Sequence, residues 1–219
     1  MSDAATDTLS PEAELALAWS SPKVRGPLSI AFKFDRRLAR IVARTNEPML
    51  GQMRLAWWRE ALGKPPEARP QGDTVLDALG VAWAGQEAAL VQMIDAWEIL
   101  ITAEHMDTAQ ARAFGAGRGV FFGALGSGAG EGSTQRLATA GLRWALADAV
   151  TAVSDAAERR VMIAAGLAEP SVKDRFPAQL RGFAVLEALA LRALRRGGRP
   201  LMDGRGAPLT ALRAAIFRG

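Results

Sequence analysis

Alanine is the commonest residue of this chain, and no stretch alternates persistently between apolar and polar side chains. Alanine has the highest intrinsic helix propensity, whereas a half-buried strand needs an alternation with a period of two. Of the 219 residues, 49% are apolar and only 23% are charged, a balance that favours a folded domain over disorder. The sequence therefore predicts an all-α fold.

Capping residues, prolines and glycines mark where the predicted helices begin and end. We expect residues 1–26 to form an N-terminal segment with a short helix, and residues 27–219 to form a single helical domain. The expected helices cover residues 10–19, 28–44, 47–62, 73–84, 86–104, 108–125, some twenty or more residues capped by Ser133, 177–196 and 208–217.

Several classes of protein are excluded by composition. The chain has no cysteine and one histidine, which excludes disulfides, thiolate sites and metal sites built from several histidines. The first ten residues do not resemble a signal peptide, and no run of about 18 uncharged apolar residues occurs. The net charge of +4 does not by itself indicate a nucleic-acid partner, which would require a clustered basic face, and we expect no such partner. We expect a cytoplasmic protein, with a membrane-peripheral position as the alternative.

The expected helix over residues 28–44 is amphipathic, with an acidic exception. On a helical wheel its basic residues share one arc: Lys33, Arg36, Arg37, Arg40 and Arg44. This basic arc is either a solvated face or a contact with anionic lipid or an acidic partner. Asp35, in contrast, lies in the middle of the apolar side.

The next expected helix has the opposite exception, because Arg54 lies among apolar residues that include Trp57 and Trp58. A lone buried charge costs several kcal/mol unless it is paired. Since a very short link joins the two helices, they should pack antiparallel. We expect Asp35 and Arg54 to meet, or each to hold a ligand in a polar cavity. Trp57 and Trp58 cannot both face one narrow stripe, so one of them is expected to line a cavity or an interface.

Four strings of sequence resemble the squalene/phytoene synthase family. They are AFKFDRRLARI with EPMLGQMRLAWWREAL in residues 31–62, the small-residue helix AFGAGRGVFFGALG, and ATAGLRWALADAV at residues 138–150. The resemblance spans most of residues 27–155 and implies an isoprenoid synthase-like helical bundle around a central cavity. It also implies substrate-binding positions at Asp35, Arg36, Arg54, Trp58 and Asp148.

Active members of this family hold Mg²⁺ with two DxxxD-type motifs on facing helices, and the metal stabilises the leaving diphosphate. Here the first motif falls on Ala39 and Ala43. The second begins at Asp148, but its partner position is Ala152. Asp155 lies two turns farther along and is the remaining candidate metal ligand. Asp148 is the one candidate catalytic residue, and a solvated acidic face is its alternative explanation.

Other carboxylates and glycines have plainer explanations. Asp95 and Glu98 are three residues apart, so they could face together as substitute metal ligands. The DxxxD that begins at Asp73 follows a proline-rich loop, where helix capping explains it. Glycines recur every four residues at Gly115, Gly119 and Gly123, a spacing that allows close helix packing or room for an apolar chain.

Two functions follow from these patterns, with a helical interaction protein without a ligand as a third. The first is a non-catalytic protein that binds a prenyl diphosphate or apolar lipid or assists the assembly of a complex. It would resemble the family branch that includes respiratory complex I assembly factors, which share a similar MR-x-x-WW-like run. The second is an active Mg²⁺-dependent prenyltransferase that condenses isoprenyl diphosphates in squalene or carotenoid synthesis. We expect no cofactor for the first and Mg²⁺ for the second. A protein partner or a membrane surface is compatible with both.

Overall fold

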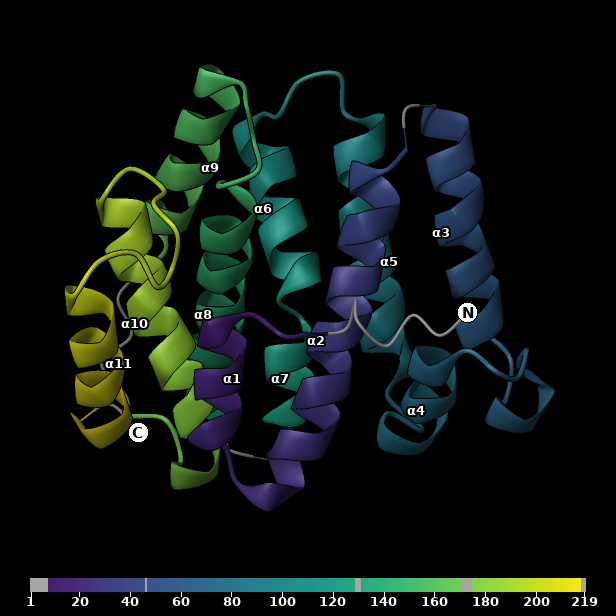
Figure 1. Ribbon diagram of the computed structural model, residues 1–219, viewed down its shortest axis with the longest axis horizontal. Helices are drawn as coiled ribbons and strands as arrows, with labels where there is room; N and C mark the ends of the chain where they lie inside the picture. Colours follow the sequence, from purple (N-terminus) through teal and green to yellow (C-terminus); the bar gives the residue numbers. More distant parts are fainter. Residues whose placement is uncertain (1–7, 46, 129–130, 171–174, 218–219) are drawn as a thin grey trace.

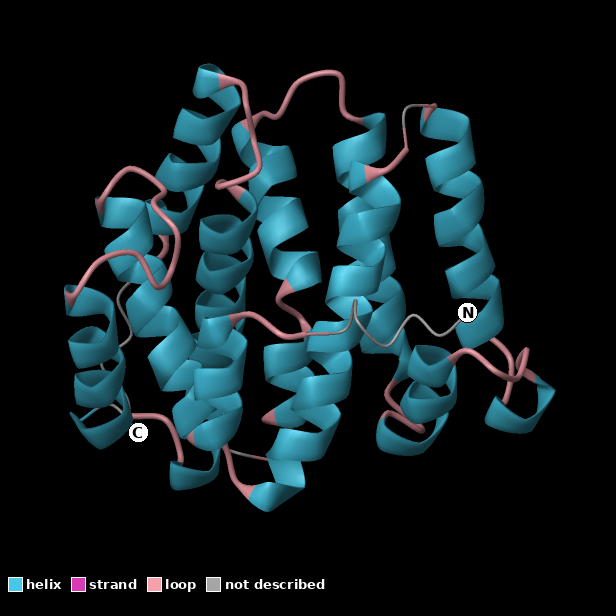
Figure 2. Cartoon of the chain, viewed as in Figure 1, coloured by secondary structure: helices cyan, strands magenta, loops and turns pink. Residues whose placement is uncertain are grey.

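The computed structural model describes residues 8–45, 47–128, 131–170 and 175–217, and the described part is helical without strands (Figures 1 and 2). The α-helices are α1 (Pro11–Ala18), α2 (Pro22–Ala43), α3 (Pro48–Leu62), α4 (Thr74–Ala82), α5 (Glu87–Thr102), α6 (Thr108–Arg118), α7 (Phe121–Leu125), α8 (Glu131–Ala149), α9 (Ala156–Ala168), α10 (Arg181–Arg195) and α11 (Gly206–Phe217). Short 3₁₀ helices cover Pro66–Ala68 and Ala178–Leu180. The all-α prediction is confirmed, and the arrangement is isoprenoid synthase-like.

Helix α8 occupies the middle of the bundle, where it packs against α6, α7, α9 and α10 (Figure 1). Helix α2 packs against α4, α5 and α7, and α1 packs against both α2 and α10. Helix α3 lies at one edge, against α5 and α2, and α11 lies at the opposite edge, against α10 (Figure 1). Within the described residues no helix is both long and apolar enough to cross a membrane.

Several helix boundaries follow the local sequence signals. Helix α3 begins at Pro48 and ends at Leu62, as predicted. The Asp73 side chain caps α4 by accepting hydrogen bonds from the backbone N–H groups of Val75 and Leu76, at 2.9 and 3.1 Å. This capping confirms the plainer explanation of the DxxxD sequence at that point.

The helix expected over residues 28–44 begins earlier, because α2 starts at Pro22 and contains Pro27, so it crosses the expected boundary between residues 26 and 27. Two further predicted helices also differ from the structure. The segment expected to be one helix over residues 108–125 is divided into α6 and α7, because the hydrogen-bond ladder changes register after Arg118. There the N–H of Val120 donates to the carbonyl of Gly117 instead of to a residue four positions back. The second error concerns Ser133, which lies inside α8 and does not cap it. Helix α8 ends at Ala149, and Asp155 begins a separate helix, α9.

The division between α6 and α7 lies where α6 and α8 meet most closely. A Cβ atom built on Gly119 would overlap the backbone of Gly141 in α8, and one built on Gly141 would overlap the backbone of Gly119. A Cβ on Gly115 would lie 3.0 Å from Leu142 and Leu146, whereas Gly123 has open space around it. The glycine spacing therefore serves close packing at Gly115 and Gly119, but not at Gly123.

A buried ion pair also ties α8 to α10. Arg143 donates through Nη1 to Oε1 of Glu187 at 2.8 Å, and both side chains are almost completely buried. The second terminal nitrogen of Arg143 donates to the carbonyl of Glu169 at 2.7 Å, beyond the end of α9. One guanidinium thus joins three helices and fixes the position of the central helix.

Candidate functional site

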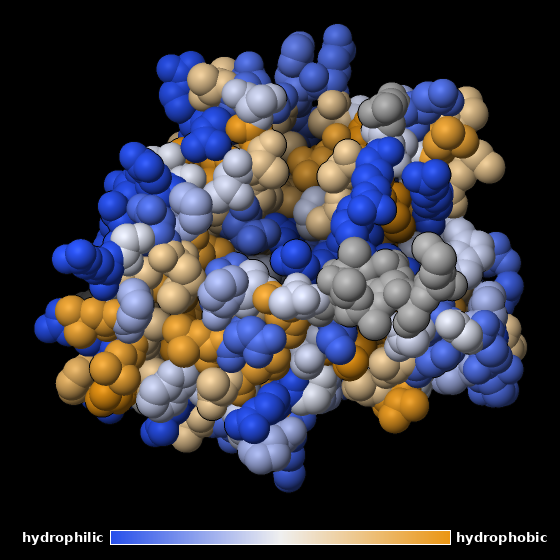
Figure 3. Space-filling view, viewed as in Figure 1, coloured by the Kyte–Doolittle hydropathy of each residue, from blue (hydrophilic) through white to orange (hydrophobic). Residues whose placement is uncertain are grey.

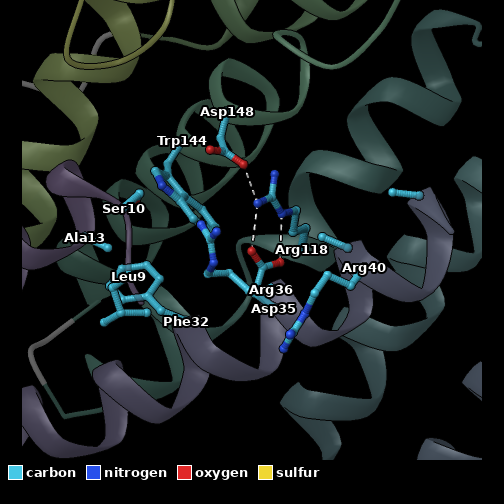
Figure 4. Close-up of a pocket in the computed structure, with 12 residues that line it drawn as sticks. Leu9, Ser10, Ala13, Phe32, Asp35, Arg36, Arg40, Arg118, Trp144 and Asp148 are labelled. Carbon is cyan, nitrogen blue, oxygen red and sulfur yellow. Dashed lines mark hydrogen bonds and ion pairs between the residues drawn. The ribbon is translucent and has the colours of Figure 1, made fainter. Parts of the chain in front are cut away.

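A cavity of about 230 Å³ lies between α1, α2, α6 and α8 (Figure 4). Apolar side chains and small residues form much of its wall, and three arginines and two aspartates supply the charge. The lining residues are Leu9, Ser10, Ala13, Phe32, Asp35, Arg36, Ala39, Arg40, Ala43, Arg118, Trp144 and Asp148. We refer to this space as the central cavity.

The polar side of the central cavity is built on an ion pair between α2 and α6. Arg118 donates through Nε to Oδ1 of Asp35 at 2.8 Å and through Nη2 to Oδ2 at 2.7 Å. This two-point geometry is the strong form of the arginine–carboxylate pair. Trp97 of α5 donates its indole N–H to Asp35 Oδ1 at 2.9 Å. The buried Asp35 carboxylate is therefore bound by two different helices.

Arg118 also reaches α8, so it joins carboxylates from two facing helices. Its Nη2 donates to Oδ2 of Asp148 at 2.6 Å, and its Nη1 donates to the carbonyl of Ala145 at 2.9 Å (Figure 4). The Arg118 and Asp35 side chains are only 3% and 4% exposed, whereas that of Asp148 is 37% exposed. Asp148 is thus the member of this triad that a molecule in the cavity can reach.

The surroundings hold Arg118 in its charged form. Burial by itself opposes the charge, but the carboxylates of Asp35 and Asp148 outweigh that cost and raise the pKa of Arg118 above its ordinary value. The guanidinium carbon also lies 4.7 Å from the ring centroids of both Trp97 and Trp144. These distances suit cation–π attraction from two aromatic rings. The centre of the site is therefore a permanent cation.

The expected pairing of Asp35 with Arg54 is wrong. Arg54 is exposed on α3, where its Nη1 lies 3.5 Å from the hydroxyl of Thr45. Helix α3 packs mainly against α5, so the face that carries Arg54 does not reach the buried side of α2. Asp35 is buried and paired, as the wheel required, but its partner comes from α6.

Of the two other binding residues predicted on the N-terminal helices, one lines the central cavity and the other does not. Arg36 lines the central cavity. Trp58 is buried against Phe34, with 5.1 Å between the ring centroids, and does not belong to the cavity lining. Its neighbour Trp57 is 42% exposed, so one of the two tryptophans does face outward.

The residues of the basic arc of α2 have different surroundings. Arg36 and Arg40 line the central cavity, while Arg37 forms an ion pair with Asp73 at 3.1 Å. Arg44 is exposed beyond the end of the helix. The arc is therefore only in part a solvated face, because two of its members line the cavity.

The carboxylates available at the cavity do not fit a magnesium site. The positions expected for the first motif, Ala39 and Ala43, line the cavity without offering an oxygen ligand. Asp155 is the N-cap of α9, where its carboxylate accepts hydrogen bonds from the backbone N–H groups of Ala157 and Glu158. It does not share a helix with Asp148. Among the described residues no group of three or more potential ligand side chains converges.

The remaining acidic pair is bound elsewhere. Asp95 and Glu98 do face together on α5, as their spacing predicts, but both accept hydrogen bonds from Arg59 of α3. Burial lowers the pKa of Arg59, but hydrogen bonds and charge attraction from Asp95 and Glu98 raise it above the ordinary value overall. The pair therefore lies on the α3–α5 contact and outside the central cavity.

Arg118 and Trp144 are the residues that the sequence patterns did not single out. Arg118 lies in the string of small residues at the end of α6, where the recurring glycines drew attention to packing alone. A usable signal was present, since Arg118 is three residues from Gly115 and next to Gly119, on the side of α6 that packs closely. A charged side chain there must be buried and paired.

Comparisons with known proteins match only part of the chain. Neither the comparison with curated proteins nor the one with solved structures gives a match. A comparison with protein families does give a match, and the matching residues include Asp35 and Arg36, whereas Arg118 and Asp148 lie beyond them. Residues 8–114, just under half of the chain, match the family model described as squalene/phytoene synthase, and the chain is similar to that family over these residues.

Proposed function

We propose that this chain is a non-catalytic squalene/phytoene synthase-like protein that binds a prenyl diphosphate or a similar anionic lipid in the central cavity. The observation that carries the proposal is the position of Arg118. Its guanidinium bridges carboxylates from the facing helices α2 and α8, the place where the family resemblance implies a metal between aspartates. A built-in cation there neutralises the carboxylates that would otherwise bind Mg²⁺.

The lining of the cavity supports an anionic ligand with an apolar chain. Arg36 supplies a basic side chain to the lining, while Phe32 and Trp144 offer apolar surface beside it. A basic side chain in a recessed site attracts anions. The volume of about 230 Å³ is below the usual range of roughly 300–1,000 Å³ for small-molecule sites. A head-to-head synthase must hold two prenyl chains, and this space suits at most part of one.

The direct test is calorimetric titration with farnesyl diphosphate in the presence of EDTA. We expect binding without divalent metal, and a loss of about tenfold in affinity for Arg36→Ala, because one charge-assisted contact is removed. Arg44→Ala is the matched control, since it removes a basic residue of the same helix region outside the cavity. Inorganic diphosphate and farnesol, titrated separately, distinguish recognition of the head group from recognition of the chain. Equal affinities for the two variants would contradict the proposed site.

An active prenyltransferase is the second candidate, and one observation favours it. Asp35 and Asp148 do converge on one cavity from two facing helices. Incubation with farnesyl diphosphate and Mg²⁺ decides between the two functions. Release of diphosphate above that of a heat-denatured sample would overturn the non-catalytic proposal.

A role in complex assembly is the remaining candidate, favoured by the outer face of α3. Four apolar side chains are exposed there, between 42% and 71%: Met49, Leu50, Met53 and Trp57. An exposed apolar patch of this kind is typical of protein contacts. Affinity capture from the source cells with the wild type and with Met53→Ser/Trp57→Ser tests it. A partner retained equally by both would exclude this face.

A further inference from the structure

Helix α11 buries its small side chains and exposes its large apolar ones. Its buried face, which packs against α10, consists of alanines: Ala207, Ala211, Ala214 and Ala215. Its large apolar side chains are exposed instead, at 56% for Leu209, 46% for Leu212, 53% for Ile216 and 65% for Phe217. Residues spaced three, four and seven apart share one side of a helix. Leu209, Leu212 and Ile216 have this spacing and form one continuous apolar ridge, which we call the α11 ridge, whereas Phe217 lines the groove beside α10.

Arginines lie beside the α11 ridge, in a groove along one side of the helix and in the segment that precedes it. A groove of about 440 Å³ between α10 and α11 is lined by Arg192, Arg195, Arg196 and Arg213 together with Phe217. Arg199 and Arg205 are exposed in the segment that joins the two helices. Figure 3 shows hydrophobic surface at the lower left, where Figure 1 places α11, next to strongly hydrophilic side chains.

Most of this positive charge is not neutralised by the protein. Asp203 is the acidic residue of this region, and it pairs with Arg196 at 3.3 Å while its carbonyl accepts from Arg192 at 2.8 Å. Within the part of the chain that the structure describes, Arg195, Arg199, Arg205 and Arg213 are exposed and form no ion pair. The surface beside the ridge, which we call its rim, is therefore positively charged.

We propose that the α11 ridge docks on the surface of an anionic lipid bilayer. In this arrangement Leu209, Leu212 and Ile216 enter the boundary between head groups and acyl chains, and the arginines beside the ridge contact lipid phosphates. A helix with an apolar face and a basic rim lies in the plane of such an interface. A symmetric contact with a second copy is disfavoured, because it would bring two arginine-rich rims together. The surface is separate from the central cavity and does not depend on the function proposed for it.

Co-sedimentation with vesicles tests the proposal. We expect the protein to bind phosphatidylcholine vesicles that contain about 30% phosphatidylglycerol, to bind pure phosphatidylcholine weakly, and to dissociate as salt is added. Arg213→Gln should lower the partition coefficient about fivefold, and Leu212→Ser/Ile216→Ser should lower it at least as much. Val81→Ser is the matched control, because Val81 is 86% exposed on α4, away from the ridge.

The outcomes separate the alternatives. The mutated side chains are exposed, so unchanged circular dichroism and melting temperature are expected to show that the variants fold. Absence of binding to anionic vesicles overturns the proposal, as does binding that the ridge variants and Val81→Ser affect equally. Concentration-dependent self-association that Leu212→Ser/Ile216→Ser abolishes, without vesicle binding, would assign the ridge to a protein interface instead.

Discussion

At the scale of single residues, Arg118 organises the centre of the molecule. It donates hydrogen bonds to both oxygens of Asp35 and to one oxygen of Asp148, and its guanidinium carbon lies 4.7 Å from the ring centroids of Trp97 and Trp144. Removing one partner of a buried pair leaves an uncompensated charge, which costs far more than the pair contributes in total. The two aspartates should differ, because one is buried and the other is more than one-third exposed.

Asp35→Ala is expected to lower the free energy of unfolding by about 3 kcal/mol or more, since the Arg118 guanidinium stays buried with half its charge partners removed. Asp148→Ala should cost only about 0–1 kcal/mol, because water can replace that carboxylate. Urea denaturation of both variants measures the difference. Similar losses for the two variants would show that Asp148 is as integral to the fold as Asp35.

Asp155 gives a pH-dependent prediction. Hydrogen bonds from the backbone N–H groups of Glu158 and Ala157 lower the pKa of Asp155 below its ordinary value of 3.8. A lowered folded-state pKa means that the contribution to stability is complete above 3.8 and is lost as the pH falls through the lowered value. Asp155→Asn keeps a capping side chain that does not titrate. Thermal melts should therefore show a wild-type advantage at pH 7 that shrinks below about pH 4. An advantage independent of pH would contradict this role.

At the scale of helices, the contact between α6 and α8 positions the cavity. Gly119 and Gly141 bring the two backbones together, and Arg118 precedes Gly119 directly. This approach lets the Arg118 side chain reach the carbonyl of Ala145 and the carboxylate of Asp148 on the facing helix.

Gly119→Ala is expected to destabilise the protein by about 3 kcal/mol, at the upper end of the cost of overpacking, because its Cβ would overlap backbone atoms that cannot rotate away. Gly123→Ala is the control. It adds the same methyl group where no atom lies within 4 Å, and it improves helix propensity. Chemical denaturation should rank Gly119→Ala far below the wild type and Gly123→Ala at or above it. The reverse ranking would show that α6 and α8 can separate at little cost.

The helices illustrate what local signals can and cannot predict. Pro48 and Asp73 mark helix starts through capping chemistry that depends on neighbouring residues only. The division between α6 and α7 lies at the close approach to Gly141, more than twenty positions away, and a contact between such distant residues cannot be read from a local pattern. The partner of Asp35 was missed for the same reason. Wheel geometry shows that a charge must be buried, but it does not show which distant helix neutralises it.

At the scale of the whole molecule, the bundle separates three surfaces. The central cavity lies between α1, α2, α6 and α8, the exposed apolar face of α3 lies at one edge, and the α11 ridge lies at the other (Figure 1). The resemblance to squalene/phytoene synthases predicted the fold and the general place of the cavity. It did not predict the α11 ridge, which follows from the alanines that α11 buries.

Binding of a ligand in the cavity should stabilise the entire domain, because its walls come from α1, α2, α6 and α8 together. Farnesyl diphosphate at 100 times its dissociation constant should add about 2.7 kcal/mol to the unfolding free energy. Differential scanning fluorimetry should therefore show a higher melting temperature, unchanged by EDTA. A shift that appears only with Mg²⁺ would favour the metal-dependent alternative.

The contact between Gly119 and Gly141 has a consequence for how this protein can diverge. In most cores a larger residue on one helix can be balanced by a smaller one opposite, so paired changes keep the volume constant. Here both positions already carry the smallest residue, and each backbone lies where the other's Cβ would be. Neither residue can be replaced by a smaller one, so a larger residue on one helix cannot be compensated by a smaller residue on the other. Descendants of this chain can change the crossing only by moving α6 relative to α8, and with it the cation that α6 carries.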